Sequence, residues 1–476
     1  MKTLKNYLYN LSFQLLTIIL PIITTPYVSR ILQVDGVGRY SVSYAVTNYF
    51  VLFGLLGFSG YGNREIAYVR NNKEEKIQTF WEINNARFLT MGLSTLVYVV
   101  YVICAVSPEL KMLYAVQGFT LAASWVDISW YYTGTEEFKT TALRNIAVKL
   151  FSVVLIFSFV KQKSDLVLYA LIISASAFAG NVFLWKGIDI RGDFKWRRTR
   201  KGKTVYHLKR TMGLWIPALA INVFAYLDKI MLGFICDETQ VGLYESSDKI
   251  ARMAVYAVTS FTSVILPKTA NLYANNQIGE FKEKIHYALS FVMMLAIPIS
   301  FGIMGISKTI VPWFFGQGYA QVEYLLLISS WLTLTLGLSS VFGNAVLIAL
   351  NREKQYTFAV VVAAVLNILE NIILIPKFQA YGALIATVMS EYTNMLIMMF
   401  FAREFFDMKS FLQSFAKYVL LGIFMGVITY SIGLVLEPKM LTTFLQILVG
   451  VLVYCVSLLL VRDKNMLLFL RMVRRK

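Results

Sequence analysis

The segment Met440–Val461, MLTTFLQILVGVLVYCVSLLLV, runs for 22 residues without a charged side chain. A helix of about 20 apolar residues is long enough to cross the hydrocarbon core of a bilayer. Similar apolar runs occur at 7–31, 40–62, 84–106, 112–133, 142–160, 166–187, 212–235, 249–272, 284–306, 324–350, 356–377, 381–402 and 413–436. The sequence therefore predicts an all-α, polytopic membrane protein with about 14 transmembrane helices.

The composition of the whole chain agrees with this fold class. Of the 476 residues, 57% are hydrophobic and only 15% are charged, which is too little charge to cover a water-soluble protein of this length. The three cysteines have no pairing or metal-binding spacing, and only two histidines are present. We expect a transporter rather than an enzyme, with no cofactor and no metal site.

The formal net charge of +18 could suggest a nucleic-acid partner, but the placement of the basic residues argues against one. Alternate loops, predicted to be cytoplasmic, hold about 32 of the 45 Lys and Arg residues, and the opposite loops hold about 9. The loop from Lys186 to Arg210 alone holds ten. This distribution predicts that both termini are cytoplasmic. The run Arg197–Lys203 is predicted to anchor on anionic lipid.

The basic loop divides the chain into six spans before it and eight after it. Val37-Gly38-Arg39-Tyr40 and Val241-Gly242-Leu243-Tyr244 each follow the first span of their half, which indicates an internal repeat. The predicted organisation is an N-terminal lobe over 1–187, a basic cytoplasmic linker over 188–211, a C-terminal lobe over 212–405, and two further helices with a basic tail over 406–476.

Ionisable side chains on the apolar runs are candidates for function, because a charge inside a bilayer costs several kcal/mol. They are Arg30, Arg64, Arg87, Asp127 and Lys149 in the first half, and Asp228, Lys229, Arg252, Glu370 and Glu391 in the second. The first set is net positive and would favour an anionic group. Carboxylates in the second set would suit a proton or a sodium ion. Pairing between helices and snorkelling to the interface are the alternatives.

Two helical faces add polar candidates. Asn367, Glu370 and Asn371 are spaced i, i+3 and i+4, so they share a face that could coordinate a cation or hydrogen-bond to neighbouring helices. Trp130 and Tyr131 share a predicted face with Asp127, and aromatic rings stack on sugars. A saccharide contact is therefore predicted there.

Several motifs occur together in this chain. Asp127–Lys139 reads DISWYYTGTEEFK, Asp228–Gly233 reads DKIMLG, Asn63–Ala67 reads NREIA, and Gly36–Tyr40 reads GVGRY. Together they resemble polysaccharide repeat-unit flippases of the Wzx type, in the multidrug/oligosaccharidyl-lipid/polysaccharide exporter superfamily. The similarity extends from about residue 5 to residue 405.

The resemblance implies two six-helix lobes around a central cavity, followed by two C-terminal helices. It also implies a function: moving undecaprenyl-diphosphate-linked oligosaccharides from the inner to the outer leaflet of the bacterial cytoplasmic membrane by alternating access. Such units serve capsule, O-antigen or exopolysaccharide synthesis. Expected partners are the lipid-linked oligosaccharide, membrane lipid, a polysaccharide polymerase and chain-length proteins, with no nucleic acid.

This hypothesis assigns roles to two groups of residues. The predicted substrate contacts are Arg30, Arg64, Arg87, Asp127, Trp130, Tyr131, Lys149, Lys229 and Arg252. The predicted ion-coupling residues are Asp228, Asn367, Glu370, Asn371 and Glu391.

Three other functions compete with this hypothesis. A cation-coupled multidrug antiporter of the same superfamily would have an acid-rich cavity, whereas the charged residues of the first half are basic. A membrane polysaccharide polymerase generally needs a sizeable outer loop, and all predicted loops are short. A peptidoglycan-precursor flippase would differ only in its lipid-linked substrate.

Overall fold

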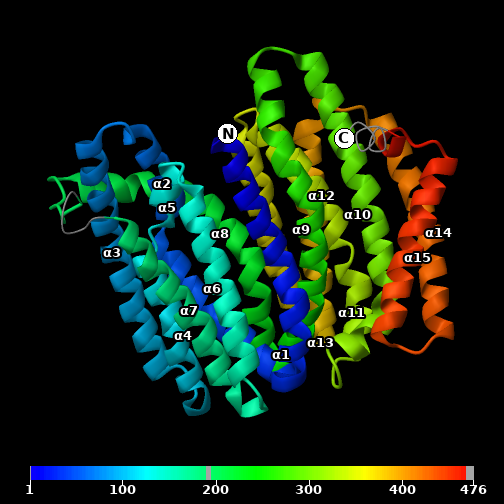
Figure 1. Ribbon diagram of the computed structural model, residues 1–476, viewed down its shortest axis with the longest axis horizontal. Helices are drawn as coiled ribbons and strands as arrows, with labels where there is room; N and C mark the ends of the chain where they lie inside the picture. Colours follow the sequence, from blue (N-terminus) through cyan, green and yellow to red (C-terminus); the bar gives the residue numbers. More distant parts are fainter. Residues whose placement is uncertain (1, 189–193, 468–476) are drawn as a thin grey trace. The chain divides into compact units, whose positions relative to one another are not determined.

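The computed structural model describes residues 2–188 and 194–467, and all regular structure within these residues is helical (Figure 1). The chain forms two compact units, Met1–Ile230 and Met231–Lys476. The boundary falls near the end of α8 (Lys203–Ile235), whereas the sequence analysis places the junction between the lobes at 188–211. Part of that predicted linker, 189–193, and the end of the predicted basic tail, 468–476, lie outside the described residues.

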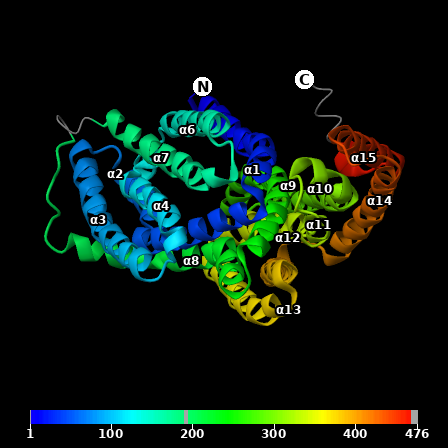
Figure 2. The same cartoon turned by 90° about the horizontal axis from the view of Figure 1, so that it is seen from below.

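The first unit is a bundle of long helices with short connections. Besides α8, it contains α1 (Lys2–Leu55), α2 (Phe58–Val69), α3 (Lys73–Cys104), α4 (Pro108–Val126), α5 (Ser129–Gly134), α6 (Phe138–Phe159), α7 (Leu166–Leu184) and the short 3-10 turns η1 (Lys163–Asp165) and η2 (Trp185–Gly187). Seen end-on, α3, α4, α7 and α6 follow one another, and α4 packs closely on α7 (Figure 2).

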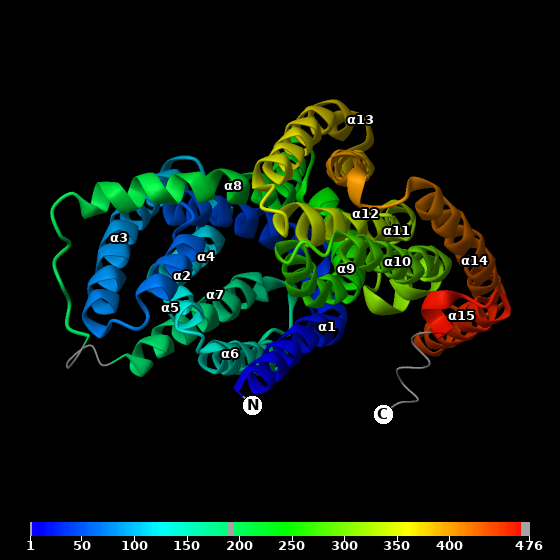
Figure 3. The ribbon, with the colours of Figure 1, turned by 90° about the horizontal axis from the view of Figure 1, so that it is seen from above.

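The second unit is also entirely helical in its described part. It contains α9 (Glu238–Ala274), α10 (Ile278–Phe314), α11 (Val322–Ser329), α12 (Leu332–Ser340), the π-helix η3 (Val341–Ile348), α13 (Glu353–Ala402), the 3-10 turn η4 (Arg403–Phe405), α14 (Met408–Val435) and α15 (Met440–Leu460). Helices α14 and α15 pack on each other and on α10 (Figure 3). These two are the trailing helices expected from the sequence.

All fourteen predicted spans fall on helices, which confirms the predicted fold class. Helix α13 contains two predicted spans, separated by a kink at Gln379 (φ 52°, ψ −127°). Helix α1 contains the first predicted span and most of the second, separated by a kink at Gln33 (φ 61°, ψ 177°), and the end of the second lies on α2. The span predicted at 324–350 is divided among α11, α12 and η3. Within the described residues, nine segments are long and apolar enough to cross a membrane, two of which hold a predicted pair.

The kink in α13 shows how the chain turns between two predicted spans. The helical hydrogen-bond ladder is broken at Gln379, and the side-chain Oε1 of Gln240 on α9 accepts a hydrogen bond from the backbone N–H of Ala380 at 3.3 Å. A Cβ on Gly382 would lie 2.3 Å from the carbonyl oxygen of Leu374, so only glycine permits this close approach of the two segments.

Candidate functional site

The helix break between α4 and α5 lies inside the DISWYYTG motif. Asp127 ends α4 in an extended conformation (φ −72°, ψ 113°), and its Oδ1 accepts a hydrogen bond from the N–H of Ser129 at 2.8 Å at the start of α5. Asp127 therefore does not share a continuous helical face with Trp130 and Tyr131, as the sequence analysis assumes. The carboxylate instead accepts the first backbone N–H of α5, which has no partner within that helix.

A break of this kind leaves the last carbonyls of α4 without helical partners, and side chains from α3 and η2 bond to them. The guanidinium of Arg87 donates from Nη1 to the carbonyl of Asp127 and from Nη2 to that of Trp125 at 2.7 Å. The indole Nε1 of Trp185 donates to the carbonyl of Val126 at 2.7 Å. Three consecutive carbonyls are thus bonded by two side chains.

Arg87 is fully buried, and the negative charge of Asp127 nearby offsets part of the cost of burying it. In this conformation the guanidinium braces the α4–α5 break and does not face open space. Its predicted contact with substrate requires a conformation in which this pairing opens.

Trp130 and Tyr131 belong to an aromatic core at the same end of the first unit. The ring of Trp130 stacks on Phe80 at a centroid distance of 5.5 Å, and Tyr131 meets Phe80 edge-on at 5.3 Å. Both residues are more than nine-tenths buried. Gly62 on α2 packs directly on the Trp130 ring, because a Cβ there would lie 2.5 Å from it. The rings therefore pack against protein in this structure and leave no open face for a sugar.

The remaining candidates of the first unit lie on α1, α2, α6 and α8. Arg30 on α1 and Arg64 on α2 are exposed, and Lys149 on α6 is half-buried. Asp228 and Lys229 are adjacent on α8, where Asp228 is buried and Lys229 half-buried. The two exposed arginines are the cations in this group with the freest access to a bulky anion.

In the second unit, α9 and α13 bring predicted residues together. Arg252 donates from Nε to Oδ2 of Asp248 at 2.7 Å, one helical turn earlier on α9. The carboxylate of Glu391 on α13 also attracts Arg252, and it accepts a hydrogen bond from Nδ2 of Asn394 at 3.3 Å. Asp248 and Glu391 are both buried, so this cluster places two carboxylates around one guanidinium within an apolar bundle.

The polar face predicted on 356–377 is present on α13. Nδ2 of Asn371 donates to Oδ1 of Asn367 at 3.2 Å, and both residues are fully buried. Glu370 is only half-buried, and its Oε2 has no hydrogen-bond partner among the described residues. The Oδ1 atom of Asp248 also has no hydrogen-bond partner among the described residues. Unsatisfied buried carboxylate oxygens of this kind can accept a proton or a cation.

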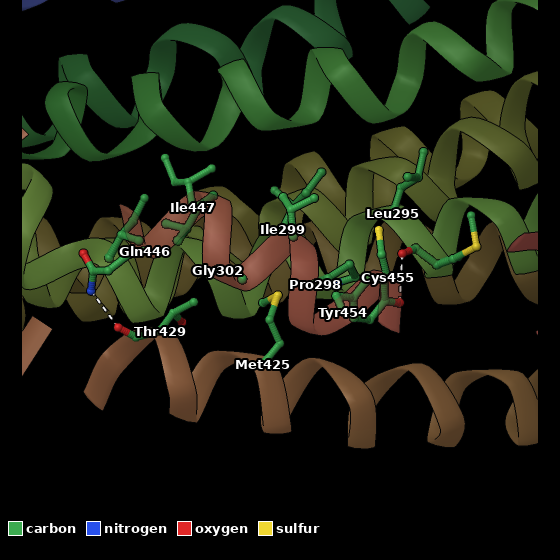
Figure 4. A pocket seen from close by; sticks show the side chains of 15 residues that line it. Leu295, Pro298, Ile299, Gly302, Met425, Thr429, Gln446, Ile447, Tyr454 and Cys455 are labelled. Atoms are coloured by element: carbon green, nitrogen blue, oxygen red, sulfur yellow. Dashed lines mark hydrogen bonds between the residues drawn. The ribbon is translucent and has the colours of Figure 1, made fainter. Parts of the chain in front are cut away.

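An apolar cavity of about 360 Å³ lies between α10, α14 and α15 (Figure 4). Its walls include Ile299, Gly302, Met425 and Ile447. The polar groups at its edge are already bonded: Nε2 of Gln446 donates to the carbonyl of Thr429 at 2.7 Å, and the hydroxyl of Tyr454 donates to the carbonyl of Met294 at 3.0 Å. The cavity therefore suits a hydrocarbon chain rather than a polar ligand.

A buried carboxylate holds the basic loop to the first unit. Glu82 on α3 accepts hydrogen bonds from Nε of Arg200 at 2.6 Å and from its backbone N–H at 3.1 Å, and it lies 3.4 Å from Nε2 of His207. The hydrogen bonds that Arg200 donates to Glu82, and secondly to Glu75, raise the pKa of the guanidinium above its ordinary value. Arg197 lies 3.7 Å from Glu74.

Two of these arginines, Arg197 and Arg200, belong to the run predicted to anchor on lipid. They form ion pairs with carboxylates of α3 in this structure.

Glu82 and Asp248 were not among the predicted site residues, although the spacing of polar residues around each of them indicates a role. Glu75, Gln78, Glu82 and Asn85 are spaced i, i+3, i+7 and i+10, which is a polar stripe on one face of a helix. Asp248 stands four residues before Arg252, the spacing of an ion pair along a helix.

Comparison with known proteins identifies the family. The family model described as "Polysaccharide biosynthesis protein" matches residues 3–273, more than half of the chain. The chain belongs to this family. A second model, "Lipid II flippase MurJ", matches residues 140–450. These matches confirm the resemblance to Wzx-type flippases drawn from the motifs.

Two relatives of this polysaccharide biosynthesis protein have low sequence identity to it, but the similarity covers most of each protein. A protein assigned as an O-antigen transporter in Escherichia coli (strain K12) is 24% identical over 409 residues, covering 84% of this chain and 96% of the relative. A protein of the same assignment in Shigella dysenteriae is 22% identical, covering 80% of this chain and 94% of the relative.

Solved structures share the fold of this family member. The lipid II flippase MurJ in an inward closed conformation has a TM-score of 0.70 at 18% identity, covering 93% of this chain and 99% of MurJ. An inward-facing multidrug resistance transporter of the MATE family has a TM-score of 0.60 at 12% identity, covering 81% of this chain and 97% of that one.

Replacing Arg87 by alanine should destabilise the protein, because it leaves the carbonyls of Trp125 and Asp127 buried without a donor. We expect a loss of about 2–5 kcal/mol, measured as a lower thermal unfolding midpoint in detergent. Arg64→Ala, which removes an exposed arginine, should leave the midpoint unchanged. A wild-type midpoint for Arg87→Ala would contradict the bracing role.

Replacing Glu82 by alanine should release the basic loop, because Arg200 loses its buried acceptor. We expect trypsin to cleave after Arg197, Arg200 or Lys201 several-fold faster than in the unmodified protein, with a lower unfolding midpoint. Glu74→Ala is the matched control, since the Glu74 side chain is 85% exposed and its ion pair is long. Equal cleavage rates in the two variants would show that Glu82 does not hold the loop.

Proposed function

We propose that this protein is a flippase that moves oligosaccharides linked to undecaprenyl diphosphate from the inner to the outer leaflet of a bacterial cytoplasmic membrane. Membership of the polysaccharide biosynthesis protein family carries this proposal. The multi-pass helical fold, which resembles that of a lipid II flippase, supports it. Both termini would then be cytoplasmic, as the distribution of Lys and Arg predicts.

The exposed arginines Arg30 and Arg64 are proposed as the first contacts of the diphosphate. Moving that group across the membrane requires removing its water, and charge-assisted hydrogen bonds from guanidinium groups offset this cost. Lys149, Lys229 and Arg252 are proposed as further cations along the path. Asp127, Trp130 and Tyr131 would contact sugar only after the α4–α5 region rearranges.

The apolar cavity between α10, α14 and α15 is proposed to hold part of the lipid chain. About 0.8 kcal/mol is gained for each buried methylene group, so even a few isoprenoid units would add to affinity. The sugar would remain in a polar environment.

Ion coupling is proposed at the cluster of Arg252, Asp248 and Glu391. Binding a proton or a sodium ion at one of its two carboxylates would raise the net charge around the guanidinium by one unit. Such a change can bias a conformational equilibrium. Asp228 and the polar face of Asn367, Glu370 and Asn371 are proposed as auxiliary coupling groups.

A multidrug antiporter is the second candidate function, favoured by the fold shared with a MATE transporter. A MATE-like function would not require lipid-linked saccharides to accumulate when the protein is lost, and this difference separates the two candidates.

The proposed polymerase and chain-length proteins would act after the flipping step.

Depleting the protein should trap complete repeat units, linked to polyprenyl diphosphate, on the inner leaflet. The measurement is mass spectrometry of these lipids combined with a test of their accessibility from outside the cell. Complete units accumulating on the outer leaflet would indicate a polymerase instead. An unchanged lipid pool would contradict the flippase proposal and favour the antiporter.

Complementation of the depleted cells then tests Arg64. We expect Arg64→Ala to lower the export rate about tenfold at normal protein level, because one charge-assisted contact with the diphosphate is lost, and Arg64→Lys to restore part of it. Arg198→Ala removes an exposed arginine of the basic loop and should export normally. Full export by Arg64→Ala would remove this residue from the proposed site.

Replacing Glu391 by glutamine should uncouple export from its driving ion. We expect export by the unmodified protein to fall when an ionophore collapses either the proton or the sodium gradient. Export by Glu391→Gln should be lower at the outset and insensitive to the same ionophore. Glu353→Gln, an exposed residue at the start of the same helix, is the control. An undiminished ionophore response in Glu391→Gln would exclude this carboxylate from coupling.

A further inference from the structure

Arg144 on α6 is a charged residue to which neither the sequence analysis nor the site described above gives a role. It lies in the second turn of α6, at the start of the span predicted over 142–160. Its side-chain stem packs on Gly180 of α7, where a Cβ would lie only 3.1 Å from Cδ of Arg144. The stem therefore runs between two helices of the bundle. An arginine that snorkels to the membrane surface would instead extend along lipid into water.

The guanidinium of Arg144 is incompletely bonded. Its Nε atom is buried and has no hydrogen-bond partner among the described residues. A charged donor that is buried without an acceptor is costly, and such a group in a native protein requires an explanation. An acceptor that arrives with a ligand is one explanation, and the charges around Arg144 indicate which kind of ligand.

Arg144 shares one carboxylate with Arg87. Asp127 attracts both guanidinium groups, and its Oδ1 also accepts the N–H of Ser129 at 2.8 Å. Arg87 is committed to the carbonyls of the α4–α5 break through both of its Nη atoms. Two guanidinium groups and one carboxylate leave a net charge of +1 within an apolar bundle, and an anion is the ligand that would neutralise it.

The predicted topology places these three residues near the cytoplasmic surface. The spans over 84–106 and 142–160 begin on that side, and the span over 112–133 ends there. Arg87, Arg144 and Asp127 all lie close to these span ends. This is the depth at which the phosphate groups of lipids in the inner leaflet lie, so an anionic headgroup reaches Arg144 without first crossing the hydrocarbon core.

We infer that Arg144 binds a phosphate oxygen of the lipid-linked diphosphate, while Arg87 keeps the α4–α5 break in place. The identity of this ligand rests on the proposed flippase function. A phosphate can accept from Nε and from one Nη of a guanidinium together, and such paired, charge-assisted bonds supply the acceptor that Nε lacks. Asp127 holds the guanidinium near the break until the diphosphate arrives. The two arginines at one carboxylate thus have separate tasks.

The test is isothermal titration of the purified full-length protein in detergent. Farnesyl diphosphate is the probe, because it joins a short isoprenoid chain to the same diphosphate group. Farnesol, which has the chain without the phosphates, measures binding by the hydrocarbon alone. We expect saturable binding of farnesyl diphosphate, clearly tighter than that of farnesol.

The variant R144A should bind farnesyl diphosphate about tenfold more weakly, since a charge-assisted contact is lost. R144K keeps the charge but loses the paired N–H groups, so it should retain part of the affinity. The matched control is K139A, which removes an exposed lysine in the first turn of the same helix and should bind normally.

The unfolding midpoint separates a role in binding from a role in structure. R144A should unfold at the wild-type temperature or above it, because it removes a buried donor that has no acceptor, whereas Arg87→Ala should unfold earlier. Where R144A does not fold, R144Q keeps the polarity and most of the length of the side chain without its charge. The same loss of affinity is then expected of R144Q.

Three results would overturn the inference. The first is farnesyl diphosphate that binds the unmodified protein no more tightly than farnesol. The second is wild-type affinity in R144A, or in R144Q where R144A does not fold. The third is an equal loss of affinity in K139A, which would show general charge attraction. Depletion of the protein tests flipping without reference to Arg144, so failure of this titration leaves the flippase proposal standing, and an unchanged lipid pool on depletion rejects flipping alone.

Discussion

Backbone amide and carbonyl groups inside a bilayer have no water to bond, and every interruption of a helix in this protein must therefore supply its own partners. The α4–α5 break is the clearest example. The carbonyls of Trp125 and Asp127 are bonded by Arg87, and the carbonyl between them by Trp185. A buried arginine is costly alone, but here it satisfies two acceptors and lies close to the Asp127 carboxylate. The buried arginine is needed because the break leaves carbonyls without partners, and those carbonyls in turn stabilise the buried charge.

The same constraint sorts the charged residues of the apolar runs into two kinds. Arg87 and Asp127 form hydrogen bonds with the backbone at the α4–α5 break. Replacing either residue would therefore mainly lower the stability of the protein. Arg30 and Arg64 are exposed, so water and a bound anion can both reach their guanidinium groups. Between these kinds lies the cluster of Arg252, Asp248 and Glu391. Its two carboxylates are buried, and Oδ1 of Asp248 has no hydrogen-bond partner among the described residues. Buried charge with incomplete pairing is the state expected of a group that exchanges an ion.

The sequence was sufficient to predict the helices, because a run of about 20 apolar residues has few other stable conformations in a membrane. It also identified which residues are expensive to bury. It could not predict their partners, since the distance from Arg87 to the carbonyls of Trp125 and Asp127 depends on how α3 packs on α4. Periodicity placed Asp127 on a face with Trp130 and Tyr131, but the extended backbone at Asp127 turns the following residues into an aromatic core. The polar stripe containing Glu82 was visible in the sequence, whereas its partner Arg200 lies 118 residues away.

The basic loop illustrates why a count of charges is a poor guide to their use. Ten basic residues between Lys186 and Arg210 suggest a surface for anionic lipid. Two of them, Arg197 and Arg200, are instead paired with glutamates of α3, and Arg200 is held by the buried Glu82. These two arginines therefore hold the loop to α3, and a count of the loop's basic residues overstates the charge that it offers to a lipid surface.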